Sequence, residues 1–422
     1  MQVFKFGGAS VKDAHGVRNM AGIIQQQNPR QLLVVISAMG ETTNALEQLT
    51  WAYLRRQADT YSFWQRVRAH HEQVIQELAG PDRSAFEQVY DLFAEVEAII
   101  GQEPEPHTHP DQVYDQLVSY GELLSTRIVN AYLNHQGLDS YWVDARRLIR
   151  TDNSHREGKV DWDRTCEYIT DSLAELLTTS VVITQGFVGS TGEGHTTTLG
   201  RDGSDYTAAI FAYCLQASGV TIWKDVPGVL NADPKWFDET VKIDQLTYQD
   251  ATELAYYGAT VIHPKTIKPL QNRNIPLYVR SFLRPQDSGT VIGNFEQRLP
   301  IPSFIFKMNQ TLISFHPKDF SFIAEENLSK IFGQFAEHGV KINLMQNTAI
   351  SFSVAVDNRP DRLARLLPRL HEEFRISYND GLELITIRHY DDKTISRVLI
   401  NKKLLVEQKS RYTVQLVVKD LG

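Results

Sequence analysis

Short apolar runs alternate with longer segments of helical periodicity through the first two thirds of the chain. The apolar runs predict strands at 2–6, 31–37, 139–143, 181–187, 220–223 and 275–280. The periodic segments predict helices within 45–100 and at 111–135, 162–178, 204–217, 247–257 and 264–272. Strands that alternate with helices imply crossover connections, so we expect a mainly parallel sheet covered by helices on both faces. This three-layer α/β/α domain is expected to span residues 1–293.

The pattern changes to shorter units after a polar, proline-containing segment at 294–302, which we interpret as a linker. Residues 303–422 contain two sets of short strands and helices that form a weak internal repeat. We expect a first small α/β unit at about 310–380 and a second at about 381–422, completed by a strand near 303–308. Two separate strands are expected on either side of Asn309.

Composition excludes several classes of protein. The 422 residues include 43 Lys and Arg against 51 Asp and Glu, a net charge of −8, which argues against a nucleic-acid partner but allows an anionic small molecule. The apolar run at 32–39 is too short to cross a membrane, and no secretory signal is visible at the N-terminus. The widely separated Cys166 and Cys214 predict neither a disulfide framework nor a zinc ribbon, so a reducing cytoplasm is the expected location.

The first candidate site is KFGG, at 5–8, directly after the first strand. Ligands of parallel sheets bind beyond the carboxyl ends of strands, and two glycines there let backbone N–H groups approach a phosphate closely. Lys5 would add a full positive charge at the same place. The same four residues are also compatible with a tight turn and a surface lysine, so this motif alone leaves both interpretations open.

The second candidate is the loop rich in glycine and hydroxyl side chains that follows the strand at 181–187. Arg201 suits bidentate binding of a carboxylate or phosphate, and Ser204 and Asp205 begin a helix. Ser204 and Asp205 could be an ordinary cap and first-turn acid, but that leaves the long polar loop unexplained.

The segment at 222–234 is a third candidate site, with weaker support. The chain has no GxxxxGK[ST], GxGxxG, HExxH or HRD motif, which excludes P-loop, Rossmann and eukaryotic-type kinase sites.

Taken together and in order, several segments resemble the aspartokinases of the amino-acid kinase family. They are KFGGASV (5–11), SAMGETTN (37–44), YGELLST (120–126), TTTLGRDGSDYTAA (196–209), WKDVPGVLNADP (223–234) and YYGATVIHP (256–264). The resemblance implies the amino-acid kinase fold and transfer of a phosphoryl group from Mg²⁺-ATP to the side-chain carboxylate of L-aspartate. The product, 4-phospho-L-aspartate, begins lysine, threonine and methionine synthesis. Two alternatives stay open: a catalytically weak regulatory subunit, and a kinase for another carboxylate such as glutamate.

The resemblance also assigns roles to individual positions. Lys5 would bridge the transferring phosphoryl group, and Asp205 would organise Lys5 and the reacting groups. The positions matching the ATP site are Lys5, Phe6, Gly7, Gly8, Lys224, Asp225, Leu230, Lys235 and Thr260. The positions matching the aspartate site are Ser37, Thr43, Glu122, Phe187, Arg201, Asp202, Gly203 and Ser204, with Glu122 for the ammonium and Arg201 for a carboxylate. No protein-held metal site is implied.

This sequence departs from the family pattern at the expected nucleotide site and in the C-terminal region. Lys224, Leu230 and Thr260 stand where the family usually has threonine, an aromatic residue and lysine. The C-terminal region resembles the paired ferredoxin-like ACT domains through which aspartokinases sense amino acids and form homodimers. Asn343 and Ala349 replace the carboxylates of lysine-sensing members, so we expect weak or absent inhibition by lysine. No dehydrogenase module follows residue 422, which predicts a monofunctional enzyme.

Overall fold

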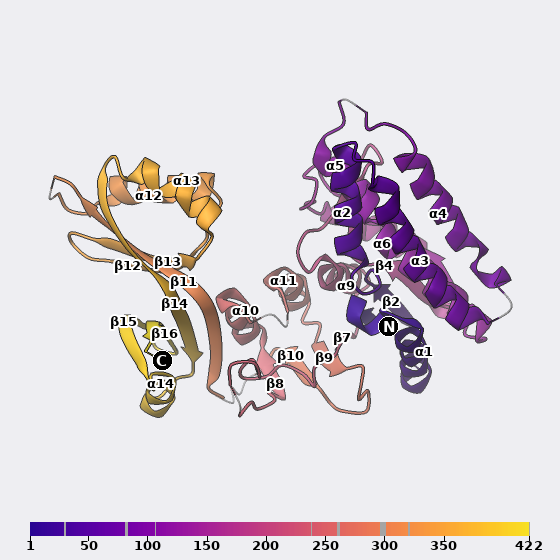
Figure 1. Cartoon of the computed structure of the whole chain (residues 1–422). Coiled ribbons are helices and arrows are strands. Elements are labelled where there is room, and N and C mark those ends of the chain that lie inside the picture. Colours follow the sequence, from indigo (N-terminus) through magenta and orange to yellow (C-terminus); the bar gives the residue numbers. More distant parts are fainter. Residues whose placement is uncertain are drawn as a thin grey trace. The chain divides into compact units, whose positions relative to one another are not determined.

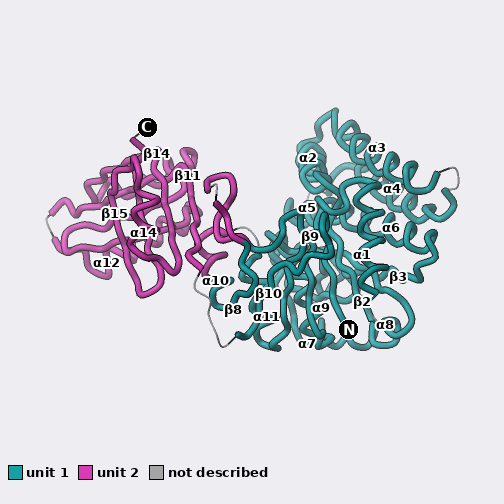
Figure 2. Tube along the Cα trace, turned by 90° about the horizontal axis from the view of Figure 1, so that it is seen from below, with its two compact units in different colours: residues 1–229, 242–252, 261–298 teal, residues 230–241, 253–260, 299–422 magenta. Residues whose placement is uncertain are grey.

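The computed structural model describes residues 1–28, 31–80, 83–105, 107–237, 239–259, 262–295, 301–319 and 321–421. They form two compact units (Figure 2). The first comprises residues 1–229, 242–252 and 261–298, and the second comprises 230–241, 253–260 and 299–422. The second unit therefore includes two segments that precede the expected linker. One reason is that Phe237 stacks on Phe304 within it, with ring centroids 4.5 Å apart.

The first unit is built on an eight-stranded sheet (Figure 1), whose order is β3-β4-β2-β1-β7-β9-β10-β8. Its strands are β1 (Gln2–Phe6), β2 (Leu32–Ile36), β3 (Ser140–Val143), β4 (Val181–Gln185), β7 (Gly219–Lys224), β8 (Gln245–Thr247), β9 (Leu277–Ser281) and β10 (Thr290–Gly293). The six strands from β3 to β9 pair in parallel, and only the β9–β10 pair is antiparallel. The mainly parallel sheet is thus confirmed. A separate hairpin joins β5 (Val188–Ser190) to β6 (Thr196–Thr198).

Helices occupy most of the connections between these strands. They are α1 (Ala14–Gln27), α2 (Thr42–Leu54), α3 (Thr60–Ala79), α4 (Glu87–Ile100), α5 (Pro110–Val118), α6 (Tyr120–His135), α7 (Trp162–Leu173), α8 (Leu176–Thr179), α9 (Gly203–Cys214), α10 (Tyr248–Tyr257) and α11 (Pro264–Asn272), with short 3₁₀ turns η1 (Gly8–Val11), η2 (Ser84–Phe86) and η3 (Ala145–Arg147). The single helix expected at 111–135 is two, because α5 ends at Val118 and α6 begins at Tyr120. Among the described residues, no helix combines the length and apolarity that crossing a bilayer requires.

Alternation along β1 places the candidate lysine on one face of the sheet. Phe4 and Phe6 belong to the hydrophobic core that α1 to α6 build against the sheet. Successive strand residues point to opposite faces, so Lys5 points to the other side. Helix α9, which packs on β1, β2 and β7 and contributes nothing to that first core, covers this side. Lys5 therefore meets the N-terminal end of α9 rather than the helical layer of α1 to α6.

The two cysteines are paired, which corrects the sequence-based expectation. Cys166 of α7 and Cys214 of α9 form a disulfide across a sequence separation of 48. The two helices pack against each other, and the rings of Trp162 and Tyr213 lie 5.0 Å apart at the same contact. Spacing along the chain carries no information about which helices become neighbours, so the expectation of unpaired cysteines was wrong.

The second unit contains a six-stranded antiparallel sheet in the order β12-β13-β11-β14-β16-β15. Its elements are β11 (Ser303–Pro317), α12 (Glu325–Glu337), β12 (Ile342–Asn347), β13 (Phe352–Asp357), α13 (Pro360–Leu370), β14 (Phe374–Arg388), α14 (Asp392–Val398), β15 (Lys402–Lys409) and β16 (Thr413–Asp420). The two strands expected around Asn309 are one strand, β11, paired with β14 on both sides of a register shift between Lys307 and Gln310. Asn309 absorbs the irregularity in a left-handed conformation, with φ of 52°.

Candidate active site

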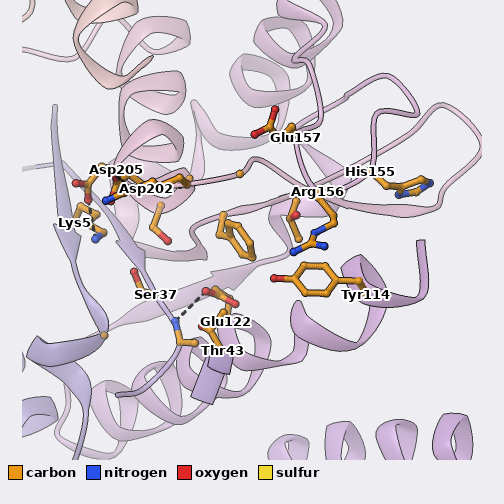
Figure 3. Close-up of a pocket in the computed structure, with 18 of the residues that line it drawn as sticks. Lys5, Ser37, Thr43, Tyr114, Glu122, His155, Arg156, Glu157, Asp202 and Asp205 are labelled. Carbon is orange, nitrogen blue, oxygen red and sulfur yellow. Dashed lines mark hydrogen bonds and ion pairs between the residues drawn. The ribbon is translucent and has the colours of Figure 1, made fainter. Parts of the chain in front are cut away.

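A cavity of about 920 Å³ opens in the first unit beyond the carboxyl ends of β1, β2 and β7. Lys5 comes from β1, Ser37 directly follows β2, and Lys224 is the last residue of β7. β1 lies between β2 and β7 in the sheet, and the chain leaves it toward β2 before returning on the β7 side. Such a reversal point is where open parallel sheets bind ligands. In the view of Figure 3, Lys5 and Asp205 lie at one end of the cavity, and Arg156 and Tyr114 lie at the other.

Two lysines hold one buried carboxylate at the first end. The Lys5 Nζ atom lies 2.7 Å from Asp205 Oδ1, and the Lys224 Nζ atom lies 3.4 Å from Asp205 Oδ2. Burial by itself would raise the pKa of Asp205, but the charges of Lys5 and Lys224 outweigh it and hold this pKa below its usual range. Asp205 also stands in the first turn of α9, where the helix dipole favours a negative charge. The cluster carries a net positive charge, which suits an anionic ligand.

Glu122 is a second buried acid in the same cavity, with a different environment. It lies in the first turn of α6, and its Oε1 accepts a hydrogen bond of 3.2 Å from the backbone N–H of Ala38. Among the described residues its Oε2 has no hydrogen-bond partner. Burial raises the pKa of Glu122 to about 8, an effect that the Ala38 N–H and the charge of Lys5 only partly oppose. An unsatisfied buried carboxylate oxygen beside Ser37 and Thr43 is a place for a ligand cation or hydrogen-bond donor.

Two glycines permit the close approaches that shape the cavity. A Cβ atom on Gly8 would lie 2.7 Å from the carbonyl oxygen of Ala38, so only glycine lets the turn after β1 approach the turn after β2 this closely. A Cβ atom on Gly186 would lie 2.4 Å from the Cβ of Ser204. The end of β4 therefore touches the start of α9, which helps to place Asp205.

The comparisons with known proteins agree with this geometry. The model of the amino acid kinase family matches residues 1–281. The chain is 32% identical over 399 residues to lysine-sensitive aspartokinase 3 of Escherichia coli, covering 91% of this chain and 86% of that protein. The chain belongs to the amino acid kinase family, and within it to the aspartokinases. It is also 30% identical over 367 residues to the chloroplastic aspartokinase 1 of Arabidopsis thaliana, across 84% of this chain and 63% of that one.

Solved structures of aspartokinase III from Escherichia coli resemble this aspartokinase along nearly its whole length. One of them, in complex with lysine and aspartate, has a TM-score of 0.84 at 29% identity and covers 99% of this chain and 95% of that one. Another, in complex with aspartate and ADP, has a TM-score of 0.82 and covers 99% and 96%. The expected fold class, an amino-acid kinase fold followed by an ACT-like antiparallel region, is therefore confirmed.

The residues expected at the aspartate site all line this one cavity. They are Ser37, Thr43, Glu122, Phe187, Arg201, Asp202, Gly203 and Ser204. Arg201 is the least enclosed of them, because its side chain is 81% exposed and its Nε lies 3.8 Å from Asp202 Oδ2. Asp202 adopts a left-handed backbone with φ of 54° at the start of α9. The binding of a substrate carboxylate by Arg201 stays a prediction.

The residues expected at the nucleotide site are spread more widely. Lys5, Gly8 and Lys224 line the cavity, and Gly7 lies between the first two. The Phe6 side chain is fully buried and stacks on Trp223 in the core, so only its backbone could contact a nucleotide. Asp225 is exposed directly after β7. Leu230 and Lys235 belong to segment 230–241 of the second unit, and Thr260 lies outside the described residues, so their roles stay predictions.

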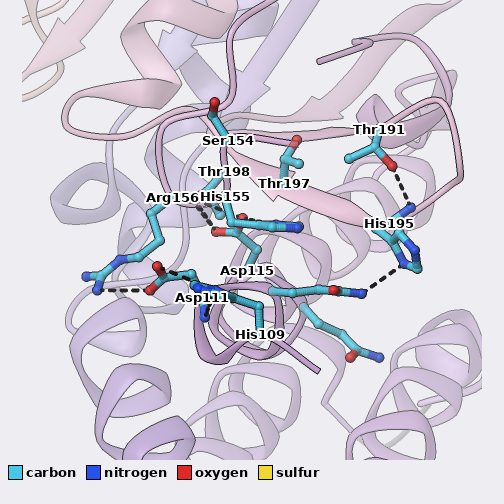
Figure 4. Close-up of polar contacts among 12 residues, drawn as sticks. His109, Asp111, Asp115, Ser154, His155, Arg156, Thr191, His195, Thr197 and Thr198 are labelled. Carbon is cyan, nitrogen blue, oxygen red and sulfur yellow. Dashed lines mark hydrogen bonds and ion pairs between the residues drawn. The ribbon is translucent and has the colours of Figure 1, made fainter. Parts of the chain in front are cut away.

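One network at the far end of the cavity was missed by the sequence analysis (Figure 4). Asp115 of α5 is fully buried and accepts hydrogen bonds from the Thr198 hydroxyl at 2.6 Å and from the Arg156 backbone N–H at 2.9 Å. Its Oδ2 lies 2.9 Å from the Nδ1 of His155. Burial raises the pKa of Asp115, while these donors oppose the rise. No local motif marks this network, because its partners are 40 to 83 residues apart.

Arg156 is the most distinctive residue that this network positions. Its backbone is left-handed, with φ of 66°, and its guanidinium lies 4.1 Å from the centre of the Tyr114 ring. Glu47 and Asp111 each approach the guanidinium to 3.6 Å. Asp115 fixes the backbone of Arg156, and these contacts hold its side chain. The guanidinium is therefore held in place at the end of the cavity away from Lys5.

Proposed function

We propose that this aspartokinase transfers the γ-phosphoryl group of ATP to the side-chain carboxylate of L-aspartate, forming 4-phospho-L-aspartate. This reaction is the first step of lysine, threonine and methionine biosynthesis. The observation that carries the proposal is the Lys5–Asp205–Lys224 cluster in the same cavity as the buried, unsatisfied carboxylate of Glu122. The lysine cluster suits the phosphoryl group that is transferred, and Glu122 suits the ammonium group of the substrate.

The reaction needs charge neutralisation and positioning more than it needs a base. A substrate carboxylate is ionised at pH 7 and attacks phosphorus directly, so no side chain has to remove a proton. Lys5 and Lys224 would stabilise the negative charge that spreads over the phosphoryl oxygens in the transition state. Asp205 would hold both ammonium groups in place. The backbone N–H groups of Gly7 and Gly8 would add donors to the phosphates.

Mg²⁺ would enter this site as part of the Mg²⁺-ATP substrate. The ion prefers phosphate oxygens and water and needs few protein ligands. Lys5 and Lys224 already neutralise Asp205, so the phosphates rather than this carboxylate would hold the ion.

Trapping of the acyl phosphate as a hydroxamate tests the proposal. Purified protein is assayed with ATP, Mg²⁺ and either aspartate or glutamate, and Lys5→Ala and Asp205→Ala are compared with the exposed-lysine control Lys393→Ala. We expect hydroxamate with aspartate from the wild type and the control, and none from the two site variants. A product formed only with glutamate would identify another carboxylate kinase. No product under any condition would favour the regulatory subunit.

The ACT-like region is proposed to bind an amino-acid effector and to join two copies of the chain. Strand β12 lies at an edge of the six-stranded sheet, and Phe322, Met345 and Ile350 are each more than half exposed on this unit. An open edge with exposed apolar side chains supports a second copy as its cover. Light scattering of the purified chain should give twice its 48.1 kDa mass, and a monomer at micromolar concentration would refute the homodimer.

Regulation by lysine is proposed to be weak. Asn343 stands where lysine-sensing members have a carboxylate, and its amide is already engaged by Lys307 at 2.8 Å, Gln310 at 2.9 Å and Asp357 at 2.8 Å.

A cytoplasmic location is proposed as well. It follows from the resemblance to the family alone, since the Cys166–Cys214 disulfide removes the support that unpaired cysteines would have lent it.

A further inference from the structure

A second cavity of about 430 Å³ lies entirely within the first unit, between α7, α9 and α11. It shares only Glu157 and Lys159 with the active-site cavity. Apart from Gly158 and Val160, its remaining lining comes from residues of α7, α9 and α11 that the proposed reaction does not use. Its volume is within the usual range for small-molecule sites, about 300–1,000 Å³.

One wall of this cavity is aromatic. Trp162 of α7 packs edge-on against both Tyr206 and Tyr213 of α9, with ring centroids 6.4 Å and 5.0 Å apart. All three side chains are only partly buried, so their rings remain accessible from the cavity. Partly exposed rings of this kind offer edges and faces against which a planar ring can stack.

A second part of the lining is cationic. Lys265 and Lys268 stand one turn apart on α11, and Lys159 also lines the cavity. Across the described part of the chain, Lys265 and Lys268 form no ion pair with a carboxylate, while the charge of Lys159 helps to lower the pKa of Asp152. Glu157 is the one acidic residue among the described residues that line the cavity. In a protein whose net charge is −8, Lys265 and Lys268 together create a local field at this cavity that favours an anion.

We propose that this cavity is a binding site for a small aromatic anion, in which a ring packs against Trp162 and Tyr213 and a phosphate or carboxylate group contacts Lys268 and Lys265. The aromatic wall and the cationic wall face the same space, so a ligand with both features gains from both. Tyr206 directly follows Asp205 in α9, so an occupied cavity would lie against the helix that carries Asp205.

Equilibrium binding to the full chain tests this proposal without relying on catalysis. Calorimetric titrations with phenyl phosphate and with phenylpyruvate distinguish the two sources of negative charge. Two controls separate these features: inorganic phosphate carries the charge without the ring, and benzyl alcohol carries the ring without the charge. The variants are Lys268→Gln, Tyr213→Ala and the exposed control Lys393→Ala, with Lys5→Ala included to identify binding at the active site instead.

We expect at least one of the two aromatic anions to bind with a submillimolar dissociation constant, and phosphate and benzyl alcohol to bind at least about tenfold more weakly. Lys268→Gln and Tyr213→Ala should each weaken binding about tenfold or more, while Lys393→Ala and Lys5→Ala should change it less than about twofold. The charge-only variant Lys268→Gln keeps the test valid if Tyr213→Ala unfolds. Binding of neither anion, binding unaffected by Lys268→Gln, or binding lost in Lys5→Ala would each overturn the proposal.

Discussion

Replacement of Glu122 by glutamine should stabilise the protein at alkaline pH while weakening its binding of aspartate. The carboxyl group is fully buried, one of its oxygens lacks a partner among the described residues, and burial raises its pKa from 4.5 to about 8. The folded state therefore holds a proton that the unfolded chain releases at a much lower pH. Glutamine has nearly the same shape as the protonated acid and does not titrate, so Glu122→Gln removes the cost of ionising this group.

The size of the effect follows from the two pKa values. An acid whose pKa is raised on folding does not affect the unfolding free energy below its unfolded pKa. As the pH rises from the unfolded pKa to the folded pKa, the unfolding free energy falls, because the unfolded chain releases the proton more readily than the folded chain. For Glu122 the loss begins near pH 4.5, is complete above about pH 8, and amounts to ~1.4 kcal/mol per pH unit between them, or ~5 kcal/mol in all. Between pH 6 and pH 9, the unfolding free energy of Glu122→Gln should gain about 3 kcal/mol relative to the wild type.

Urea unfolding at intervals from pH 6 to pH 9 measures this difference, with Glu167→Gln on the exposed side of α7 as the matched control. The comparison uses the change with pH, so any constant cost of the amide cancels. If Glu122→Gln and the wild type lose stability in parallel as the pH rises, the carboxyl group is not buried with a raised pKa, and the reasoning fails.

The ionised form of Glu122, which lowers stability, should raise the affinity for aspartate. Ionised Glu122 would pair with the ammonium of aspartate, so kcat/KM of the wild type should rise about tenfold per pH unit below pH 8 and level off above it. Glu122→Gln should lose this rise and raise KM for aspartate about 10- to 100-fold, as expected for a lost charge-assisted hydrogen bond. An unchanged KM would remove Glu122 from the aspartate site.

Three further predictions concern charge, covalent linkage and regulation. Lys224→Met removes the cation 3.4 Å from Asp205 and should lower kcat about 100-fold with little change in KM for aspartate; steady-state kinetics with unaltered kcat would contradict its role at the phosphoryl group. Cys166→Ser, or reduction with dithiothreitol, should lower the unfolding free energy by about 2–4 kcal/mol in urea, and no change would show that Cys166 and Cys214 are not linked. Calorimetric titration with lysine should show no tight binding, because the Asn343 amide already bonds to neighbouring side chains; a micromolar dissociation constant would refute this.

Part of the candidate site could be predicted from the sequence, because local patterns place residues at the ends of strands and helices. KFGG after the first strand put Lys5 at the edge where parallel sheets bind ligands. The polar loop before α9 marked Asp205 in the same way, and the resemblance to aspartokinases joined the two. The single helix expected at 111–135 and the two strands expected around Asn309 were wrong in detail, since a break at Ser119 and a bulge within β11 leave no clear periodic signal.

By itself, the order of apolar and polar residues determined the alternation of strands and helices and the parallel character of the main sheet. Only the tertiary structure decided which distant groups share one environment. It set the 2.7 Å contact of Lys5 with Asp205, the burial that raises the pKa of Glu122, the network around Asp115 and the pairing of Cys166 with Cys214. The physical reason is that periodicity reports which face of an element is buried, whereas contact, desolvation and charge coupling depend on the neighbours that packing brings to that face.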